Sequence, residues 1–310
     1  MAEMAIRTEA LTRDFAGVRA VDSLSLEVPA GIVFGFLGPN GSGKTTTIRL
    51  LLGLLEPTRG RAAVLGFDSQ TEAAQIRERC GALLEHPGLY ERLSAEDNLE
   101  FYGRVWRLSP DERRARSREL LTHLGLWERR REAVGTWSRG MKQKLAVART
   151  LLHRPSLIFL DEPTAGLDPV AAAALREDLY ELVAREGVTV FLTTHNLAEA
   201  EKLCAQVGVI RQGRLLAVGS PNDLRARTGG PRAEVVGRGF SPAVLAELRA
   251  RPEVANVEAQ DGHLSLELRG PVDLAPLTRL LIASGAEIEE VRKGKASLEE
   301  VFLTLVEEDQ

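Results

Sequence analysis

The sequence predicts an α/β layered fold followed by a small α+β domain. Two continuously apolar runs, at 157–160 and 188–192, have the pattern of strands that are covered on both faces. Helical patterns at 170–185 and 197–205 follow these strands, which is the alternation of an α/β fold. Residues 232–307 then predict strand, helix, strand, strand, helix, strand and a last helix. This βαββαβ order indicates a ferredoxin-like module.

The first part of the chain predicts short strands and a helix on either side of a glycine-rich loop. Residues 24–28 alternate between apolar and polar side chains, residues 29–31 form a turn, and residues 32–37 form an apolar strand. The loop comes next, and a helical pattern follows over 46–55. Residues 94–154 are expected to be almost wholly helical.

Length and composition indicate a globular protein of about two domains. The chain has 310 residues, of which 44% are hydrophobic and 27% charged. Its formal net charge of −4 provides no overall positive field that would collect nucleic acid or anionic lipid. Two cysteines, Cys80 and Cys204, cannot form a disulfide framework, so we expect them to be reduced thiols in the core.

A domain boundary is expected where the composition changes, near a Gly/Pro-rich segment. We expect a first domain over 1–228 and a small α+β domain over 229–310. Residues 231–310 hold nine Lys and Arg against 15 Asp and Glu, so this part is acidic and is not expected to bind nucleic acid. No apolar run reaches the roughly 18 residues of a membrane span, and residues 1–7 lack the apolar part of a secretion signal. We therefore expect a cytoplasmic protein whose membrane role is peripheral.

The strongest local pattern is a glycine-rich octapeptide between a predicted strand and a predicted helix. It fits G-x-x-x-x-G-K-[ST] and consists of Gly38, Pro39, Asn40, Gly41, Ser42, Gly43, Lys44 and Thr45. Glycines let backbone N–H groups surround a phosphate, and the positive end of the helix adds to the attraction. Lys44 is expected to reach the β- and γ-phosphates and Thr45 to ligate Mg²⁺, with Thr46 beside them. Kinases, GTPases and several ATPase classes share this loop, so it leaves the type of enzyme open.

Polar side chains follow the two apolar strands where each strand ends. Asp161 and Glu162 end the first strand, and His195 follows the second. A carboxylate at the end of a buried strand needs a partner, and Mg²⁺ is the expected partner of Asp161. Glu162 is then expected to accept a proton from the water that attacks the γ-phosphate. A neutral His195 can both donate and accept a hydrogen bond near that phosphate.

A segment between the phosphate loop and the acidic strand makes the chain resemble the nucleotide-binding subunits of ABC transporters over about 5–225. The segment 137–145 is similar to the family signature Leu-Ser-Gly-Gly-Gln, which Ser138 and Gly140 match. The residues Trp137, Arg139 and Met141 depart from it. Asp161 follows Ser138 by 23 residues, as the family leads us to expect. The resemblance implies a P-loop NTPase fold of ABC type, with a mixed sheet core, an antiparallel β part and a helical subdomain at about 94–154.

The resemblance also implies roles for residues that the phosphate loop alone does not explain. Phe15 stands where the family has the aromatic side chain that stacks on adenine. Glu85 stands where the family has the glutamine that approaches Mg²⁺ and water, and Asp168 matches the loop that communicates between two sites. Ser138 and Gly140 of one subunit would contact the γ-phosphate of ATP bound by the other, so the partners implied are a second copy and a separate multi-span permease.

Several features are similar to those of bacterial drug- and antibiotic-exporter ATPases. These are the segment that follows residue 84, the signature itself and residues 296–302 at the end of the small C-terminal domain. The implied function is ATP hydrolysis that powers export, at the inner face of the cell membrane. The alternatives are a soluble ABC ATPase of translation or DNA repair, an importer ATPase, and a small-molecule kinase or GTPase. A transported compound is not predictable, because the permease selects it.

Overall fold

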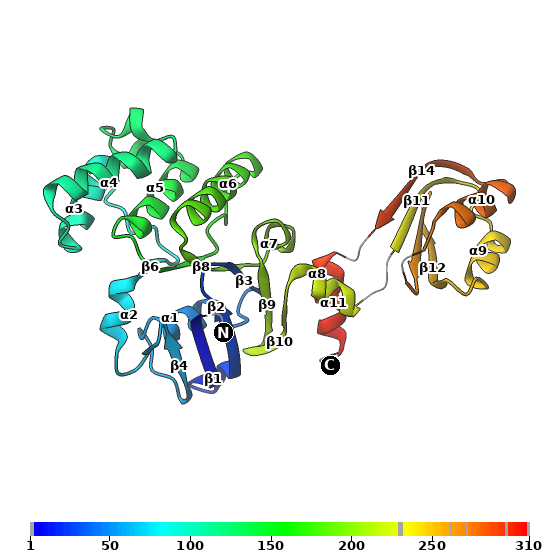
Figure 1. Ribbon diagram of the computed structural model, residues 1–310, viewed down its shortest axis with the longest axis horizontal. Coiled ribbons are helices and arrows are strands. Elements are labelled where there is room, and N and C mark those ends of the chain that lie inside the picture. Colours follow the sequence, from blue (N-terminus) through cyan, green and yellow to red (C-terminus); the bar gives the residue numbers. More distant parts are fainter. Residues whose placement is uncertain (1–2, 229–231, 261, 271, 295–296, 309–310) are drawn as a thin grey trace. The chain divides into compact units, whose positions relative to one another are not determined.

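The chain forms two compact units, Met1–Val218 and Gly219–Gln310, which we describe separately (Figure 1). The computed structural model describes residues 3–228, 232–260, 262–270, 272–294 and 297–308. The division lies ahead of the expected boundary at 228–229, because helix α8 (Pro221–Thr228) packs against the last helix, α11 (Leu298–Glu308), in the second unit. Among the helices that are described, none combines the length and the hydrophobicity that a membrane span requires.

A mixed six-stranded sheet forms the centre of the first unit. In spatial order its strands are β10 (Arg214–Gly219), β9 (Gln206–Arg211), β3 (Val33–Leu37), β8 (Thr189–Thr194), β7 (Leu157–Asp161) and β6 (Cys80–Leu83). Strands β3, β7 and β8 are buried along their whole length, as their apolar sequences predict. They pair in parallel, with Leu37 opposite Thr194 and Asp161 opposite Thr193. The carboxyl ends of these strands therefore meet at one edge of the sheet.

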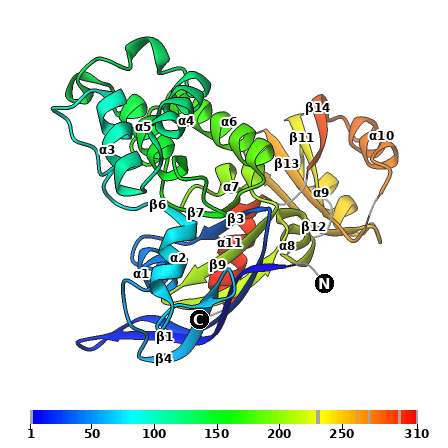
Figure 2. The ribbon, with the colours of Figure 1, turned by 60° about the vertical axis from the view of Figure 1, so that its left-hand side comes forward.

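An antiparallel sheet and two helices lie on one side of this central sheet (Figures 1 and 2). The sheet has the order β2 (Val18–Pro29), β1 (Met4–Phe15), β4 (Arg59–Val64) and β5 (Phe67–Asp68). The helices are α1 (Lys44–Leu51) and α2 (Ala73–Arg79). One core joins these layers, and in it the rings of Phe34 and Phe191 stack at 5.5 Å. This packing fixes the start of α1 against the end of β3.

Helices cover the other side of the central sheet (Figure 2). They are α3 (Ala95–Val105), α4 (Pro110–His123), α5 (Arg139–Leu151) and α6 (Pro169–Glu186), and α7 (Leu197–Leu203) follows β8. Two short 3₁₀ turns, Trp127–Arg129 and Val134–Thr136, lie between α4 and α5. Serines begin three of the helices, because the hydroxyls of Ser94, Ser109 and Ser138 accept a hydrogen bond from the first turn. Helices α3, α4 and α5 lie within 94–154, the range expected to be helical.

The second unit contains the predicted ferredoxin-like module. Its elements are β11 (Arg232–Arg238), α9 (Pro242–Arg249), β12 (Val254–Gln260), β13 (His263–Leu268), α10 (Ala275–Ala283) and β14 (Glu287–Gly294). The antiparallel sheet has the order β12-β13-β11-β14, so the first and third strands of the module are central. Its core includes Val235, Leu248, Leu266 and Leu281 from the sheet and both helices. The predicted order of strands and helices is confirmed.

Both cysteines are buried free thiols in the first unit. Burial raises the pKa of Cys80 and of Cys204 to about 12, so both remain protonated and unreactive near neutral pH. A side chain at Gly35 would place its Cβ 2.7 Å from the Cys204 sulfur. Glycine at that position therefore allows α7 and the following turn to approach β3 closely. The two thiols are part of the core, as the sequence predicts.

Candidate active site

The glycine-rich loop joins the buried end of β3 to the start of α1, and its glycines are sterically required. A Cβ at Gly38 would lie 2.3 Å from the carbonyl oxygen of Ile210, and one at Gly43 would lie 2.3 Å from that of Ala20. Gly43 also has a φ of 104° and caps α1 without a side-chain hydrogen bond. The N–H groups of the first turn of α1 consequently have no side-chain acceptor at the cap, which is the arrangement that binds an anion.

Lys44 is folded back into this loop as a buried cation. Its side chain is 5% exposed, and its Nζ donates to the carbonyl oxygens of Gly38 at 2.7 Å and of Pro39 at 3.0 Å. The same amine lies 3.3 Å from Oε1 of Glu162. The hydroxyl of Ser42 is also buried and has no partner among the described residues. A buried hydroxyl without a partner, in the same loop as a buried amine, is consistent with the predicted binding of a phosphate.

Two threonines hold the carboxylate of Asp161 at the end of β7. Thr45 Oγ1 donates to Asp161 Oδ2 at 2.6 Å, and Thr193 Oγ1 donates to Oδ1 at 2.5 Å. Asp161 is 8% exposed and faces the start of α1 across the strand ends. A hydroxyl and a carboxylate oxygen at this distance are the ligand types that Mg²⁺ takes together with nucleotide phosphates. The donor set therefore fits the predicted ion.

Glu162 has a left-handed backbone conformation, with a φ of 48°. Its N–H donates to the carbonyl oxygen and to Oγ1 of Thr193, at 3.1 and 3.0 Å. Its carboxylate has Lys44 on one side and Nδ1 of His195, 3.0 Å from Oε2, on the other. A non-glycine residue keeps such a conformation only where its surroundings fix it, and such residues are frequent at functional sites. The geometry directs a carboxylate to the edge of the phosphate-binding loop.

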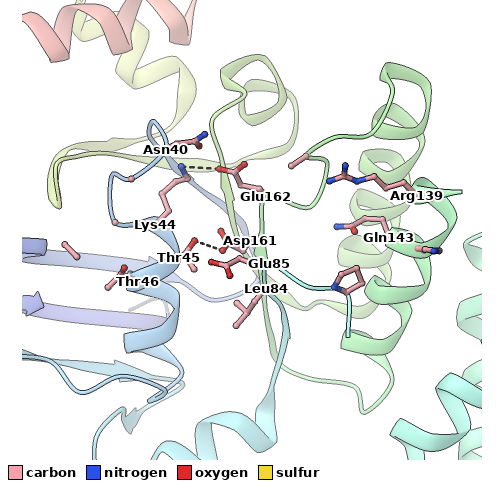
Figure 3. A pocket seen from close by; sticks show the side chains of 16 residues that line it. Asn40, Lys44, Thr45, Thr46, Leu84, Glu85, Arg139, Gln143, Asp161 and Glu162 are labelled. Carbon is pink, nitrogen blue, oxygen red and sulfur yellow. Dashed lines mark hydrogen bonds and ion pairs between the residues drawn. The ribbon is translucent and has the colours of Figure 1, made fainter. Parts of the chain in front are cut away.

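One cavity of about 590 Å³ connects these groups (Figure 3). Its lining includes nine of the residues predicted from the sequence, namely Asn40, Gly41, Gly43, Lys44, Thr45, Thr46, Glu85, Asp161 and Glu162. Glu85 is 58% exposed and pairs with Arg49 at 3.2 Å. The volume lies within the range of small-molecule sites. The strand ends and the loop therefore form a single site large enough for a nucleotide.

Other predicted residues lie outside the lining of this cavity. His195 borders a neighbouring cavity of about 330 Å³ and reaches the first one through its contact with Glu162. Ser138 and Asp168 cap α5 and α6, where they accept backbone hydrogen bonds. Gly140, in the first turn of α5, packs close to Ala171. Phe15 ends β1 with 39% of its surface exposed, and the guanidinium of Arg13 lies 4.6 Å from its ring centre.

Sequence reasoning assigned no role to several residues that shape the site. Lys142 and Gln143 line the cavity from α5, opposite the loop. Thr193 binds both Asp161 and Glu162, although the sequence only places it at the end of a strand. Glu199 is buried in α7 and accepts from Thr164 at 2.7 Å. Its position at the start of a short helix, just after His195, is the only local indication of this contact.

Comparison with known proteins decides the family. The profile of the family described as ABC transporter matches residues 21–165, and that of the C-terminal domain of DrrA1-3-like ATP-binding proteins matches residues 219–306. The daunorubicin resistance ATP-binding protein DrrA3 of Streptomyces coeruleorubidus is 38% identical over 311 residues, which cover 100% of this chain and 98% of that protein. The chain belongs to the ATP-binding subunits of ABC transporters.

Further relatives agree with this family. The bacitracin transport ATP-binding protein BcrA of Bacillus licheniformis is 33% identical, with 97% of both chains covered. A solved ATP-binding subunit of an ABC transporter superposes with a TM-score of 0.65 at 32% identity, over 72% of this chain and 92% of that one. The predicted ABC-type fold, the ATPase activity and the exporter branch are confirmed. The resistance relatives favour export over the roles in translation, DNA repair or import that the sequence left open.

Proposed function

We propose that two copies of this ABC-transporter ATP-binding subunit close on two ATP molecules and thereby drive a separate membrane permease. The observation that carries this proposal is the contact chain of Lys44, Glu162 and His195 beside the phosphate loop. The relatives with known names act in daunorubicin resistance and bacitracin transport. We therefore propose a drug- or antibiotic-like cargo, and a location on the inner face of the membrane beside the permease.

The proposed hydrolysis uses groups that the structure already brings together. The loop N–H groups and Lys44 would bind the phosphates, while Thr45 and Asp161 would hold Mg²⁺, to which Glu85 would offer a further oxygen. When bound, Mg²⁺ neutralises charge that develops on the phosphate oxygens. Glu162 accepts a proton from the attacking water, and the contact with His195 orients its carboxylate.

The residues outside the cavity support a site that is shared between two copies. Ser138 and Gly140 lie at the start of α5 and do not line the cavity of their own chain. We assign them to the γ-phosphate held by the second copy, because the start of a helix attracts an anion. Asp168 begins α6 near the same surface and would pass the state of one site to the other. Phe15, half exposed at the end of β1, would stack on adenine.

Deletion of the second unit tests the proposed domain organisation. A chain that ends at Val218 should retain a folded ATP-binding core, because the second unit has its own core and sheet. Circular dichroism and binding of a fluorescent ATP analogue should match those of the full chain. Loss of the cooperative unfolding transition on truncation would contradict this expectation.

An exposed aromatic cluster is the proposed contact with the permease. Tyr90 and Phe101 are 47% and 41% exposed, and their rings meet edge to face at 4.9 Å. Tyr102 packs edge to face against Phe101, with ring centres 5.3 Å apart, and Val105 is 59% exposed on the same helix, α3. Exposed aromatic groups of this kind mark protein interfaces more often than open surface. The cluster adjoins the loop that carries Glu85, so docking there would couple the permease to the nucleotide site.

Phe101→Ser should separate transport from hydrolysis. The isolated variant should keep its ATPase rate, because Phe101 does not line the cavity. Its affinity for permease-containing vesicles should fall by about tenfold, because aromatic side chains at interfaces often contribute more than 1 kcal/mol. Ile282→Ser is the matched control, since Ile282 is 58% exposed on α10. Equal vesicle binding by both variants would argue against this interface.

A further inference from the structure

The guanidinium of Arg139 has no hydrogen bond or ion pair to any residue that the structure describes. Arg139 is the first residue of α5 and departs from the glycine of the family signature. Its side chain lines the nucleotide cavity together with Ala165 and Glu162, and points toward the loop that follows Glu162 (Figure 3). The position of this guanidinium is therefore determined by packing rather than by an acceptor.

The guanidinium of Arg139 occupies the space that a side chain at Gly166 would fill. A Cβ built on Gly166 would lie 2.2 Å from Nη1, 2.4 Å from Cζ and 2.6 Å from Nη2 of Arg139. Gly166 also has a φ of 69°, which favours glycine. The planar group thus covers the backbone of residue 166 directly, and any movement of the loop toward the cavity would displace Arg139.

The covered segment, 163–168, is a compact loop that begins beside Glu162. Its backbone closes on itself, because Ala165 N–H donates to the carbonyl oxygen of Glu162 at 3.0 Å and Leu167 N–H to that of Thr164 at 3.1 Å. On its other side Thr164 Oγ1 donates to buried Glu199 at 2.7 Å. The loop is therefore held at Thr164 by a hydrogen bond, while Arg139 packs on it at Gly166 from the cavity.

We propose that Arg139 is a positioning residue for ATP hydrolysis. Its guanidinium packs on Gly166 and so holds the loop 163–168 in place from the cavity side. The loop starts at the residue after Glu162, whose φ is 48°, so a shift of the loop would rotate the Glu162 backbone out of this left-handed conformation. Its carboxylate would then lose its place between Lys44 and His195. Within its own chain Arg139 acts through this loop, whereas its neighbours Ser138 and Gly140 are the residues assigned to the γ-phosphate of the second copy. The proposal deepens the ATPase function and rests on the assignment of Glu162.

Steady-state ATPase kinetics of Arg139→Ala test the proposal. We expect kcat to fall about tenfold, because displacement of a catalytic group by a fraction of an ångström has an effect of this order. The KM for ATP should change less than twofold and the melting temperature should stay the same, because Arg139 is exposed. Arg139→Lys should behave like alanine, because an ammonium group cannot cover Gly166 as a planar group does. Arg131→Ala is the matched control, since Arg131 is 83% exposed and is not part of the cavity lining.

A double-mutant cycle with Gly166→Ala tests the contact itself. The added Cβ should displace Arg139 and lower kcat, and the double variant should have the kcat of Gly166→Ala alone. If the effects of Arg139→Ala and Gly166→Ala on kcat multiply as independent effects, the proposal is overturned. It is also overturned if Arg139→Ala leaves kcat unchanged, raises KM at constant kcat or lowers the melting temperature in parallel with kcat. Full activity of Arg139→Lys would overturn it as well. Glu162→Gln in the same assay separates the role of Glu162 as general base from the positioning role of Arg139. If the turnover rate does not depend on Glu162, the proposed role of Glu162 fails, whatever the result for Arg139→Ala.

Discussion

Glu162→Gln is expected to lower ATP hydrolysis by a factor on the order of 10²–10⁴, the usual contribution of a positioned general base. Glutamine has nearly the same shape, so its backbone can keep both hydrogen bonds to Thr193. It cannot accept the proton of the attacking water, because an amide oxygen is a very weak base. Binding of ATP should persist, since the loop and Lys44 remain in place.

The measurement is phosphate release together with the state of association in the presence of MgATP. We expect the Glu162→Gln variant to accumulate as an ATP-bound dimer in size-exclusion chromatography, because closure no longer ends in hydrolysis. Glu177→Gln on α6 provides a control, because Glu177 does not line either cavity at the strand ends. An unchanged turnover rate in Glu162→Gln would exclude this carboxylate as the base.

The parts of the fold that depend on neighbouring residues in the sequence were predictable. The loop before α1 is recognisable because glycine is needed where a Cβ would meet a carbonyl oxygen, as at Gly38 and Gly43. The buried strands and the serine caps follow from apolar runs and from short polar side chains before helices. The cluster of Asp161, Glu162 and His195 followed from the parallel pairing of two strands that end in polar residues.

Contacts between distant elements could not be predicted, because they depend on how helices pack on the sheet. Thr193 binds two carboxylate-bearing residues only because β7 and β8 are in a particular register. Lys142 and Gln143 face the cavity only because α5 lies opposite the loop. The two units divide after Val218, ahead of the expected boundary, and nothing local in the sequence shows that α8 packs against a helix about 80 residues further on.

Lys44→Ala is expected to weaken ATP binding by a factor of about 10–100, because a charge-assisted hydrogen bond contributes roughly 1.5–3 kcal/mol. In the structure the amine of Lys44 is already held by two carbonyl oxygens of the loop and by Glu162. Alanine removes the cation and leaves Glu162 with His195 as its nearest polar partner. The variant therefore loses attraction for the phosphates and gains an unpaired negative charge that repels them.

Thermal unfolding with and without MgATP measures this effect without any need for turnover. A ligand that binds only the folded state stabilises it by RT ln(1 + [L]/Kd), so at a nucleotide concentration about 100 times the wild-type Kd the wild type gains about 2.7 kcal/mol. Lys44→Ala should gain about 0.4–1.4 kcal/mol under the same conditions. Lys144→Ala is the matched control. The side chain of Lys144 is 20% exposed and its Nζ lies 2.7 Å from Oδ2 of Asp178, but Lys144 is not part of the cavity lining. Equal ATP-dependent stabilisation of Lys44→Ala and wild type would contradict the phosphate-binding role. The amine of Lys44 would then contact only the loop carbonyl oxygens and Glu162, and would not bind the nucleotide.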